Sequence, residues 1–584
     1  PSRTLRPPPS PHYTVADVHS NEGALAEATT SAIVRATPPA RRRLVIIAIV
    51  LILAASAGLR LWRLDFPAEY MFDEVYYAKD AKAIVDGRVG TDGSLRWAAG
   101  DAVSWPHPEI GKLSIAAGIA LFGDRAIGWR LPAALAGMIV LACVYPLARR
   151  LGLSPPWALV ALLFAAADPL GITQSRIATL DIFVATWTAV CLLLALRYIQ
   201  DGRQSRWLML SGVAGGLALA TKWSGILALF AAGSLVFGAW LWEWRIDRTR
   251  ERAAAASGAE TSDETALAAA TTEHDAAAPV HAGVPLPEID APLAAAGRPS
   301  SPGRRLLGAL FAALPVVVAF VLLPAIVYAA GYTQYFIKGH TLADWWELHR
   351  QMYAFGINLH AEHSYASIAP SWIIDYRPVW YYFEATTEYR GVVAIGNPFL
   401  WWAATLAFIA APVAALLRHK TALLLPAALI AVLYLPWFAT TRTSFLYYMT
   451  PVAPFMAILV AVALAQFAGR QDLSPRRWLF MGAVAVATAL VWNPVGRLIE
   501  WLFWQLPRQV SPTLAWVAIG AGALLAGLGV VALLSPRLRR MRPLVAVIVA
   551  GLIVGIVVAF LPVVLAIPIS QEHFSRITWF PSWI

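Results

Sequence analysis

The sequence predicts an all-α protein that crosses a membrane many times. Of its 584 residues, 59% are hydrophobic and only 14% are charged, and the mean hydropathy is +0.60. Soluble globular domains carry about 25% charged residues. Apolar runs recur along the chain at the length that a helix needs to cross a bilayer, and short basic clusters separate them. We therefore expect a polytopic membrane protein with about 11 to 13 transmembrane helices and two large extracytoplasmic loops.

The first 40 residues differ from the rest of the chain. Residues 1–40 are rich in Pro, Ala, Ser and Thr without apolar periodicity, so we expect a disordered tail. The basic cluster 41–43 precedes the first apolar run, 44–59, and the positive-inside rule then places the tail in the cytoplasm. We expect no cleavable signal peptide, because this run follows about forty polar residues and is long enough to remain as an anchor.

Further spans are expected after the first, near residues 128–148, 156–173, 178–197, 206–221, 223–243, 305–331, 397–417, 421–440, 444–468, 477–496, 512–535 and 543–566. Every second loop between them is basic, which supports this alternation and leaves the C-terminus outside. Residues 112–123 are too few to cross, so we expect an amphipathic helix at the outer interface there.

This topology divides the chain into segments. We expect an N-terminal transmembrane catalytic module at 41–244 with an extracytoplasmic loop at 64–127, a disordered cytoplasmic linker at 245–304, a second transmembrane module at 305–476 with an extracytoplasmic loop at 332–396, and C-terminal helices with an extracytoplasmic tail at 477–584. The linker is Ala-rich with scattered acidic residues, Pro and Gly. Both outer loops are dense in aromatic, His and charged residues, so function is expected in them.

The net charge of +11 does not indicate nucleic-acid binding. The basic residues lie in short clusters between apolar runs, where they orient helices in the bilayer. The cysteines, Cys143 and Cys191, fall within expected spans and are interpreted as apolar packing residues.

Two adjacent carboxylates, Asp73 and Glu74, follow the first span. A charged pair is costly to keep near hydrocarbon, so it indicates chemistry at a membrane face. The alternative is that the pair only begins an outer helix, where acidic residues are common.

Several motifs follow this pair in a fixed order. They are His107-Pro108-Glu109-Ile110-Gly111-Lys112, Arg130 within 129–137, Ser175-Arg176 with Asp181, Thr221-Lys222-Trp223-Ser224-Gly225, and the stretch 371–382 in the second outer loop. Together with Asp73-Glu74 they resemble the protein O-mannosyltransferases, of the actinobacterial branch, which have the GT-C architecture of glycosyltransferase family 39. The resemblance covers about residues 60–470 and resumes in the last span and at 579–584.

The resemblance implies inverting transfer of mannose from polyprenyl-phosphate mannose to Ser or Thr hydroxyls of secreted proteins, at the extracytoplasmic face of the plasma membrane. Asp73 matches the catalytic aspartate and would accept the proton of the attacking hydroxyl. Glu74 would position the acceptor or the Asp73 loop. The implied partners are the donor lipid, the acceptor polypeptide, membrane lipids and, as a further candidate, the translocon; nucleic acid is not among them.

The leaving phosphate needs cations to stabilise its charge. The residues proposed to bind the donor phosphate or sugar are Arg130, Lys222, Arg377, His107, Arg176 and Lys112. Lys222 lies in an outer turn where the positive-inside rule does not call for a cation. Arg130 can instead anchor its helix at the interface, and Arg377 can pair with Asp375.

Three further residues are expected to support the site: Asp181, Asp168 and His363. Asp181 can simply pair with Arg176, and Asp168 can satisfy a neighbouring Arg within the membrane. Asp73 with two loop histidines, His107 and His363, would suit a divalent metal ion, but the sequence does not fix their spacing. No cofactor is therefore predicted, although a divalent metal stays open.

The chain departs from the family pattern in two places. Glu109 and Ile110 stand where the family often has Pro and Leu, and 477–535 reads as a two-helix insertion. The loop 332–396 leaves no room for the β-trefoil domain of fungal and animal members.

Rival functions remain open. They are a lipid-linked transferase of arabinose or aminoarabinose, a transporter or flippase, and an interaction scaffold. A transporter is disfavoured because the charges gather at the outer ends of the helices and no internal repeat is evident.

Overall fold

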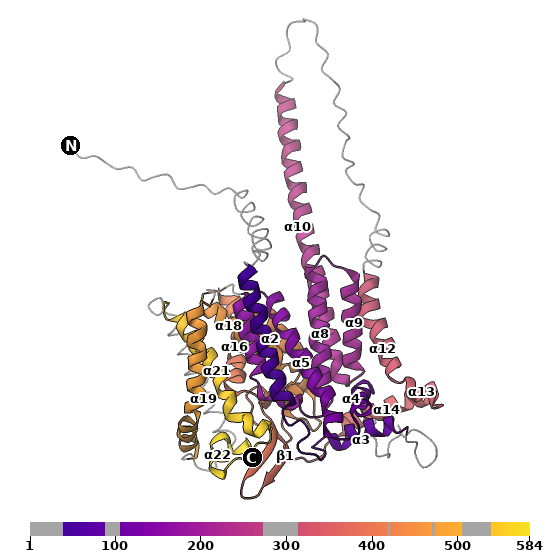
Figure 1. The fold of residues 1–584 in the computed structure, drawn as a ribbon. Coiled ribbons are helices and arrows are strands. Elements are labelled where there is room, and N and C mark those ends of the chain that lie inside the picture. Colours follow the sequence, from indigo (N-terminus) through magenta and orange to yellow (C-terminus); the bar gives the residue numbers. More distant parts are fainter. Residues whose placement is uncertain are drawn as a thin grey trace, which may run out of the picture. The chain divides into compact units, whose positions relative to one another are not determined.

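The computed structural model describes residues 39–87, 106–272, 313–418, 421–469, 473–504 and 539–583. Residues 1–51 and 52–584 form two units, and the site lies in the second. The described part is helical apart from one two-stranded sheet (Figure 1), so the expected all-α class is confirmed. The expected tail at 1–40 falls almost wholly, and the expected span at 512–535 wholly, outside the described residues.

The elements follow one another along the chain. They are α2 Pro39–Leu61, α3 Glu74–Val85, α4 Ile110–Phe122, α5 Ala126–Arg150, α6 Pro155–Ala166, α7 Pro169–Gln174, α8 Asp181–Gln200, α9 Ser205–Leu219, η1 Trp223–Gly225, α10 Ile226–Thr272, η2 Val318–Leu322, α12 Leu323–Gly331, α13 Thr333–Ile337, α14 Leu342–Asn358, α15 Ala369–Trp372, β1 Val379–Ala385, β2 Tyr389–Ala394, α16 Pro398–Arg418, α17 Leu424–Tyr434, η3 Leu435–Ala439, η4 Leu446–Met449, α18 Ala453–Phe467, α19 Pro475–Trp504, α21 Arg542–Val564, α22 Gln571–Ile577 and η6 Pro581–Trp583.

Seven helices of the described part are long and apolar enough to cross a membrane, so the protein is a multi-pass membrane protein. They include α2, α5, α8, α16 and α21, and shorter apolar helices such as α6 and α18 lie between them. The expected span 156–173 is divided into α6 and α7, because Asp168 and Pro169 interrupt the helix after Ala166. The helix expected at 112–123 is present as α4.

Helix α10 corrects the expected linker. It continues to Thr272, well beyond the expected end of its span, so the first part of the segment 245–304 is helical rather than disordered. The Ala-rich composition explains the difference, since Ala has the highest intrinsic helix propensity. The rest of the expected linker lies outside the described residues.

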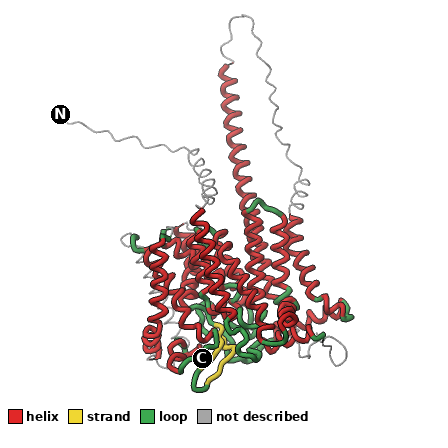
Figure 2. Tube along the Cα trace, in the orientation of Figure 1, coloured by secondary structure: helices red, strands yellow, loops and turns green. Residues whose placement is uncertain are grey.

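The sheet is an antiparallel hairpin, and the C-terminus of the chain lies beside it (Figure 2). Tyr389 of β2 forms a bridge with Ile569, and Trp380 Nε1 of β1 donates to the Trp583 carbonyl at 2.8 Å. The Trp583 indole in turn donates to the Asp375 carbonyl at 2.8 Å. Contacts from the end of the chain therefore fix the hairpin, and with it the Tyr381 side chain that lies in the site described next.

Candidate active site

Asp73 stands at the start of α3, but its carboxylate does not cap the helix. An Asp at this position usually accepts a hydrogen bond from a backbone N–H two or three residues on. Asp73 makes no such bond. Its Oδ2 instead accepts from the Tyr447 hydroxyl at 3.4 Å. The carboxylate is thus held toward the second half of the chain by one long hydrogen bond.

Opposite charges surround this carboxylate. Lys222, in the turn before η1, donates to both oxygens of Asp181, the first residue of α8, at 3.0 Å. Both side chains are buried, and the Lys222 ammonium lies 4.4 Å from the centre of the Tyr448 ring, which adds a cation–π contact. Asp73, Asp181, Lys222, Tyr447 and Tyr448 are called the Asp73 cluster below.

The cluster changes the acidity of Asp73. Burial raises the pKa of Asp73 to about 7, the positive charge of Lys222 opposes this shift, and the negative charge of Asp181 adds to it. A carboxylate that titrates near neutral pH can both hold and accept a proton under working conditions. Of the predicted site residues, the structure thus brings together Asp73, Lys222 and Asp181.

Glu74 does not share this environment. It is fully buried and forms a two-bond fork with Arg130: Nε to Oε1 and Nη2 to Oε2, each 2.8 Å. The other three N–H groups of Arg130 bond to the carbonyls of Leu64, Pro67 and Glu69. Because all five donors are used within the protein, Arg130 has none left for a lipid phosphate. We therefore correct the assignment of Arg130 to the donor phosphate. The pair holds the loop before α3, which agrees with the alternative that Glu74 positions the Asp73 loop.

Arg176 and Lys112 are also committed to the protein rather than to the donor lipid. The Arg176 guanidinium donates to backbone carbonyls at the end of α2, among them Leu59 and Trp62, which a helix end leaves unsatisfied. Lys112 is buried and forms an ion pair with Glu109 at 2.7 Å. These contacts argue against a direct role in binding the donor, which stays a prediction for both residues. Asp181 pairs with Lys222 instead of Arg176.

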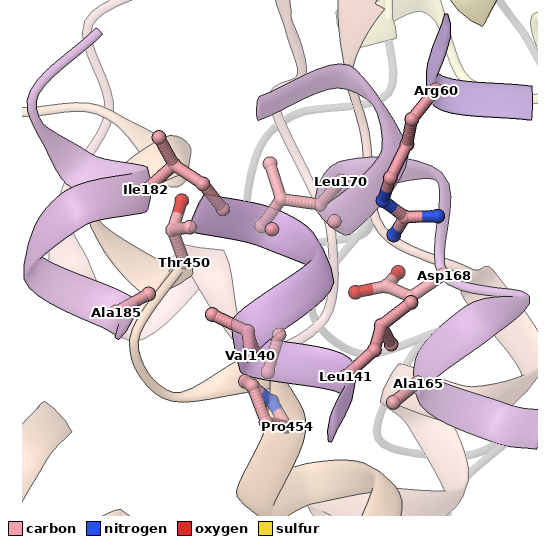
Figure 3. A pocket seen from close by; sticks show the side chains of 13 residues that line it. Arg60, Val140, Leu141, Ala165, Asp168, Leu170, Ile182, Ala185, Thr450 and Pro454 are labelled. Carbon is pink, nitrogen blue, oxygen red and sulfur yellow. The ribbon is translucent and has the colours of Figure 1, made fainter. Parts of the chain in front are cut away.

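Asp168 lies in a different place from the Asp73 cluster. Its Oδ1 accepts from the Asn397 backbone N at 2.9 Å and from the Trp401 indole at 3.3 Å. Figure 3 shows the Arg60 guanidinium pointing toward the Asp168 carboxylate at one side of a pocket. Both residues line this cavity of about 30 Å³, which is large enough to hold ordered water. Asp168 therefore joins two segments of the chain through Asn397 and Trp401, and its pairing with a neighbouring Arg stays a prediction.

The two loop histidines do not form a metal site with Asp73. In the described residues no three His, Cys, Asp or Glu side chains are grouped closely enough to hold a metal ion. Burial and the nearby charges of Lys222, Arg442 and Lys112 hold the pKa of His107 well below its usual range, so its ring is neutral. His363 is exposed and lies against Phe72, with ring centres 6.0 Å apart.

Arg377 keeps a free donor. Its Nε is buried and has no hydrogen-bond partner among the described residues. The alternative ion pair with Asp375 is absent from the described ion pairs: Asp375 Oδ1 accepts from the Gly396 backbone N at 3.1 Å, and Oδ2 is unpaired. Arg377 therefore stays a candidate for binding an anion.

Sequence reasoning missed Arg442, which lies between η3 and η4. Its charge acts on both Lys222 and His107, and its Nε is buried without a hydrogen-bond partner in the described part of the chain. Thr443 fixes this segment through its hydroxyl, which donates to the Ala361 carbonyl at 2.7 Å. The signal that marked Lys222, a cation in an expected outer turn, applies equally to Arg442.

The aromatic rings of this region come from both halves of the chain. Phe72 packs on Tyr381 of β1 with ring centres 4.8 Å apart, and Phe445 stacks on Tyr447 at 5.4 Å. An acidic group, an ammonium and the nearby charge of Arg442 thus lie at an aromatic-lined site at the start of α3, and the charge of Arg377 acts on Tyr365, whose ring centre lies 5.8 Å from that of His363. This set can accept a proton and stabilise an anion, which is the chemistry of transfer from a phosphate carrier.

Comparisons with known proteins agree with this chemistry. The family described as dolichyl-phosphate-mannose-protein mannosyltransferase matches residues 106–251, and the C-terminal four-transmembrane region of protein O-mannosyltransferase matches residues 341–583. A polyprenol-phosphate-mannose–protein mannosyltransferase of Mycolicibacterium smegmatis is 27% identical over 488 residues, which are 72% of this chain and 81% of that protein. The protein of the same name in Corynebacterium glutamicum is 24% identical, covering 65% and 74% of the two chains.

The fold is also found in a solved structure. The S. cerevisiae protein O-mannosyltransferase Pmt1-Pmt2 complex bound to the sugar donor superposes with a TM-score of 0.63 at 13% identity, covering 95% of this chain and 94% of that chain. The fold is therefore that of the GT-C glycosyltransferases. An aminoarabinose transferase of Pseudomonas aeruginosa is 32% identical, but the match covers only 30% of this chain and 31% of that protein.

Proposed function

The chain belongs to the dolichyl-phosphate-mannose–protein mannosyltransferase family and is a protein mannosyltransferase; we propose that Asp73 is the base with which it transfers mannose to a Ser or Thr hydroxyl. The proposed donor is polyprenyl-phosphate mannose. One observation supports the assignment most strongly: the uncapped Asp73 carboxylate within the buried charges of the Asp73 cluster. Glu74, the neighbouring carboxylate, is excluded as the base because Arg130 and two backbone N–H groups occupy it.

The reaction we propose is a single displacement. The acceptor hydroxyl oxygen attacks the anomeric carbon of mannose, and its proton passes to Asp73. The bond from this carbon to the phosphate oxygen breaks, and the electron pair leaves with the phosphate. Attack from the face opposite the phosphate converts a β-linked donor into an α-linked product. Arg442 and Arg377 supply free guanidinium donors for the leaving phosphate.

Asp181 and Lys222 would act on this step through charge. Asp181 holds the Lys222 ammonium in place by two hydrogen bonds. A buried ammonium near Asp73 limits how far burial raises the pKa of that carboxyl, so a useful fraction is ionised near neutral pH.

We also propose an orientation. The basic loops of the sequence favour a cytoplasmic N-terminus and an extracytoplasmic Asp73 cluster and C-terminus. The plasma membrane is the proposed location, and polypeptides leaving the translocon are the proposed acceptors.

The product class tests this function. Membranes that contain the protein should transfer labelled mannose from polyprenyl-phosphate mannose to protein, and membranes with the Asp73→Asn variant should not. Label found only in glycolipid would instead support a transferase that acts on lipid or polysaccharide.

The rate should depend on pH with an acid limb near 7. Asp73 with a pKa raised to about 7 is protonated below this value and cannot accept a proton, whereas it is ionised above it. Initial rates between about pH 5 and 9 should therefore rise with pH, with a midpoint near 7. A rate that is constant across this interval would contradict a titrating base.

Arg442→Ala should weaken use of the donor. Losing a hydrogen bond to a charged phosphate costs about 1.5 to 3 kcal/mol, so kcat/KM for the donor should fall about ten- to hundredfold. Arg350→Ala is the matched control, because that guanidinium lies on α14, is exposed and pairs only with Glu347 among the described contacts. Equal kinetics for the two variants would exclude Arg442 from the phosphate site.

A further inference from the structure

Phe72, the residue before Asp73, has an unusual backbone. Its φ is +45°, in the left-handed region that L-residues with bulky side chains rarely adopt. Such a conformation costs free energy and persists only where the surroundings impose it. Strained residues of this kind are concentrated at active sites, so the contacts that impose this one indicate its role.

One set of contacts is made by the ring. The Phe72 ring centre lies 4.8 Å from that of Tyr381, 5.8 Å from Tyr447, 6.0 Å from His363 and 6.3 Å from Phe445. All four partners belong to the second half of the chain, and Tyr447 also donates to Asp73. The rings of Tyr381, Tyr447, His363 and Phe445 are called the aromatic cage.

The other set of contacts holds the flanking backbone. The Met71 N–H donates to Glu74 Oε2 at 2.9 Å, and the Glu74 N–H donates to the Met71 carbonyl at 2.9 Å. Because Arg130 fixes Glu74, the turn is held on one side by a buried ion pair and on the other by the aromatic cage. The left-handed residue lies between these two points of attachment.

We propose that Phe72 is a positioning residue: its ring, held in the aromatic cage, keeps the turn left-handed and directs the Asp73 carboxylate away from the end of α3 and toward the reacting hydroxyl. Without the ring, the turn can relax and the carboxylate can cap the helix, as an Asp at that position normally does. The inference rests on the proposed function, since it matters only if Asp73 is the base.

We also expect the ring to limit the access of water to the carboxylate. The groups that face Asp73 are Lys222 from the turn before η1, Asp181 from α8, Tyr447 from η4, Tyr77 from α3 and Tyr381 from β1. Removing the Phe72 ring leaves these charges in place but admits water, so the pKa of Asp73 should move down toward its ordinary value.

Phe72→Ala in the full-length protein tests the proposal. We expect kcat to fall about tenfold or more while KM for the donor changes less than about twofold, because the base and not the phosphate site is affected. The acid limb of the rate should move to lower pH by about one unit or more. Phe72→Tyr retains the ring, so its kcat and the pH of its acid limb should be those of the wild type. If Phe72→Ala does not fold, Phe72→Leu, which fills most of the space without a ring, replaces it: kcat should again fall, and the acid limb should move less than in Phe72→Ala.

Phe399→Ala is the matched control, because Phe399 is also a half-buried aromatic residue and packs on Trp402 and Trp579, away from Asp73. It should retain the wild-type pH profile. A Phe72→Ala or Phe72→Leu variant with the wild-type pH profile and kcat would overturn the proposal. Asp73→Asn, measured in parallel, separates the role of Asp73 as the base from the positioning role of Phe72. If Asp73→Asn retains activity, Asp73 is not the base. If Asp73→Asn is inactive and the Phe72 variants behave as the wild type, only the positioning role of Phe72 is excluded.

Discussion

Asp73→Asn should lower the rate of mannosyl transfer by about a hundredfold or more, the usual contribution of a general base. The amide is nearly the same size as the carboxylate but cannot accept the proton of the hydroxyl. Within the described contacts the Asp73 carboxylate accepts only one long hydrogen bond, from the Tyr447 hydroxyl at 3.4 Å. The variant should therefore fold and bind the donor as the wild type does, so that kcat falls while KM for the donor is retained.

Asp86→Asn is the matched control for this variant. Asp86 lies at the other end of α3, is exposed, and pairs with Lys82 at 3.0 Å. Because it is remote from the cluster, its replacement should leave the rate within about twofold of the wild type. Near-wild-type transfer by Asp73→Asn would exclude this carboxylate as the base.

Arg130→Ala should destabilise the protein by about 3 to 5 kcal/mol, because it leaves the Glu74 carboxylate buried without its cation. Three backbone carbonyls also lose their donors. The change should appear as a large fall in Tm in detergent, and donor supplied in excess should not reverse it. Arg130→Lys should rescue little, because an ammonium cannot reproduce the two-bond fork and the contacts to three carbonyls.

Arg150→Ala provides the comparison for the Arg130 variant. Arg150 makes a similar fork with Asp201, but that pair is partly exposed. Exposed pairs contribute about 0 to 1 kcal/mol, so this variant should lose little stability. If Arg130→Ala has a normal Tm and only a higher KM for the donor, Arg130 binds lipid phosphate after all and the assignment made from its contacts is wrong.

The sequence predicts the membrane class and the position of most helices, because long apolar runs leave few alternatives. The predicted helix bounds are wrong where a local feature of the sequence acts against the apolar pattern. Pro169 divides an expected span, and the Ala-rich segment after 245 continues α10 as a helix. In both places the physical cause is local, a missing backbone donor in one and a high helix propensity in the other.

The candidate site is predicted only in part, and the reason differs from the one that applies to the helices. Charge in a predominantly apolar sequence marks Asp73, Arg130 and Lys222, but it does not show which charges satisfy one another. The pairing of Arg130 with Glu74 joins residues 56 positions apart, and only the folded chain brings them together. Arg442 had the same sequence signal as Lys222 and was overlooked because no motif surrounded it.

The most direct test of the central claim uses purified protein in liposomes with labelled polyprenyl-phosphate mannose and a peptide that contains Ser or Thr. We expect mannose linked to the peptide hydroxyl in the α configuration, formed at a rate that Asp73→Asn reduces about a hundredfold. A β-linked product, or label that never reaches the peptide, would contradict a single displacement with Asp73 as the base.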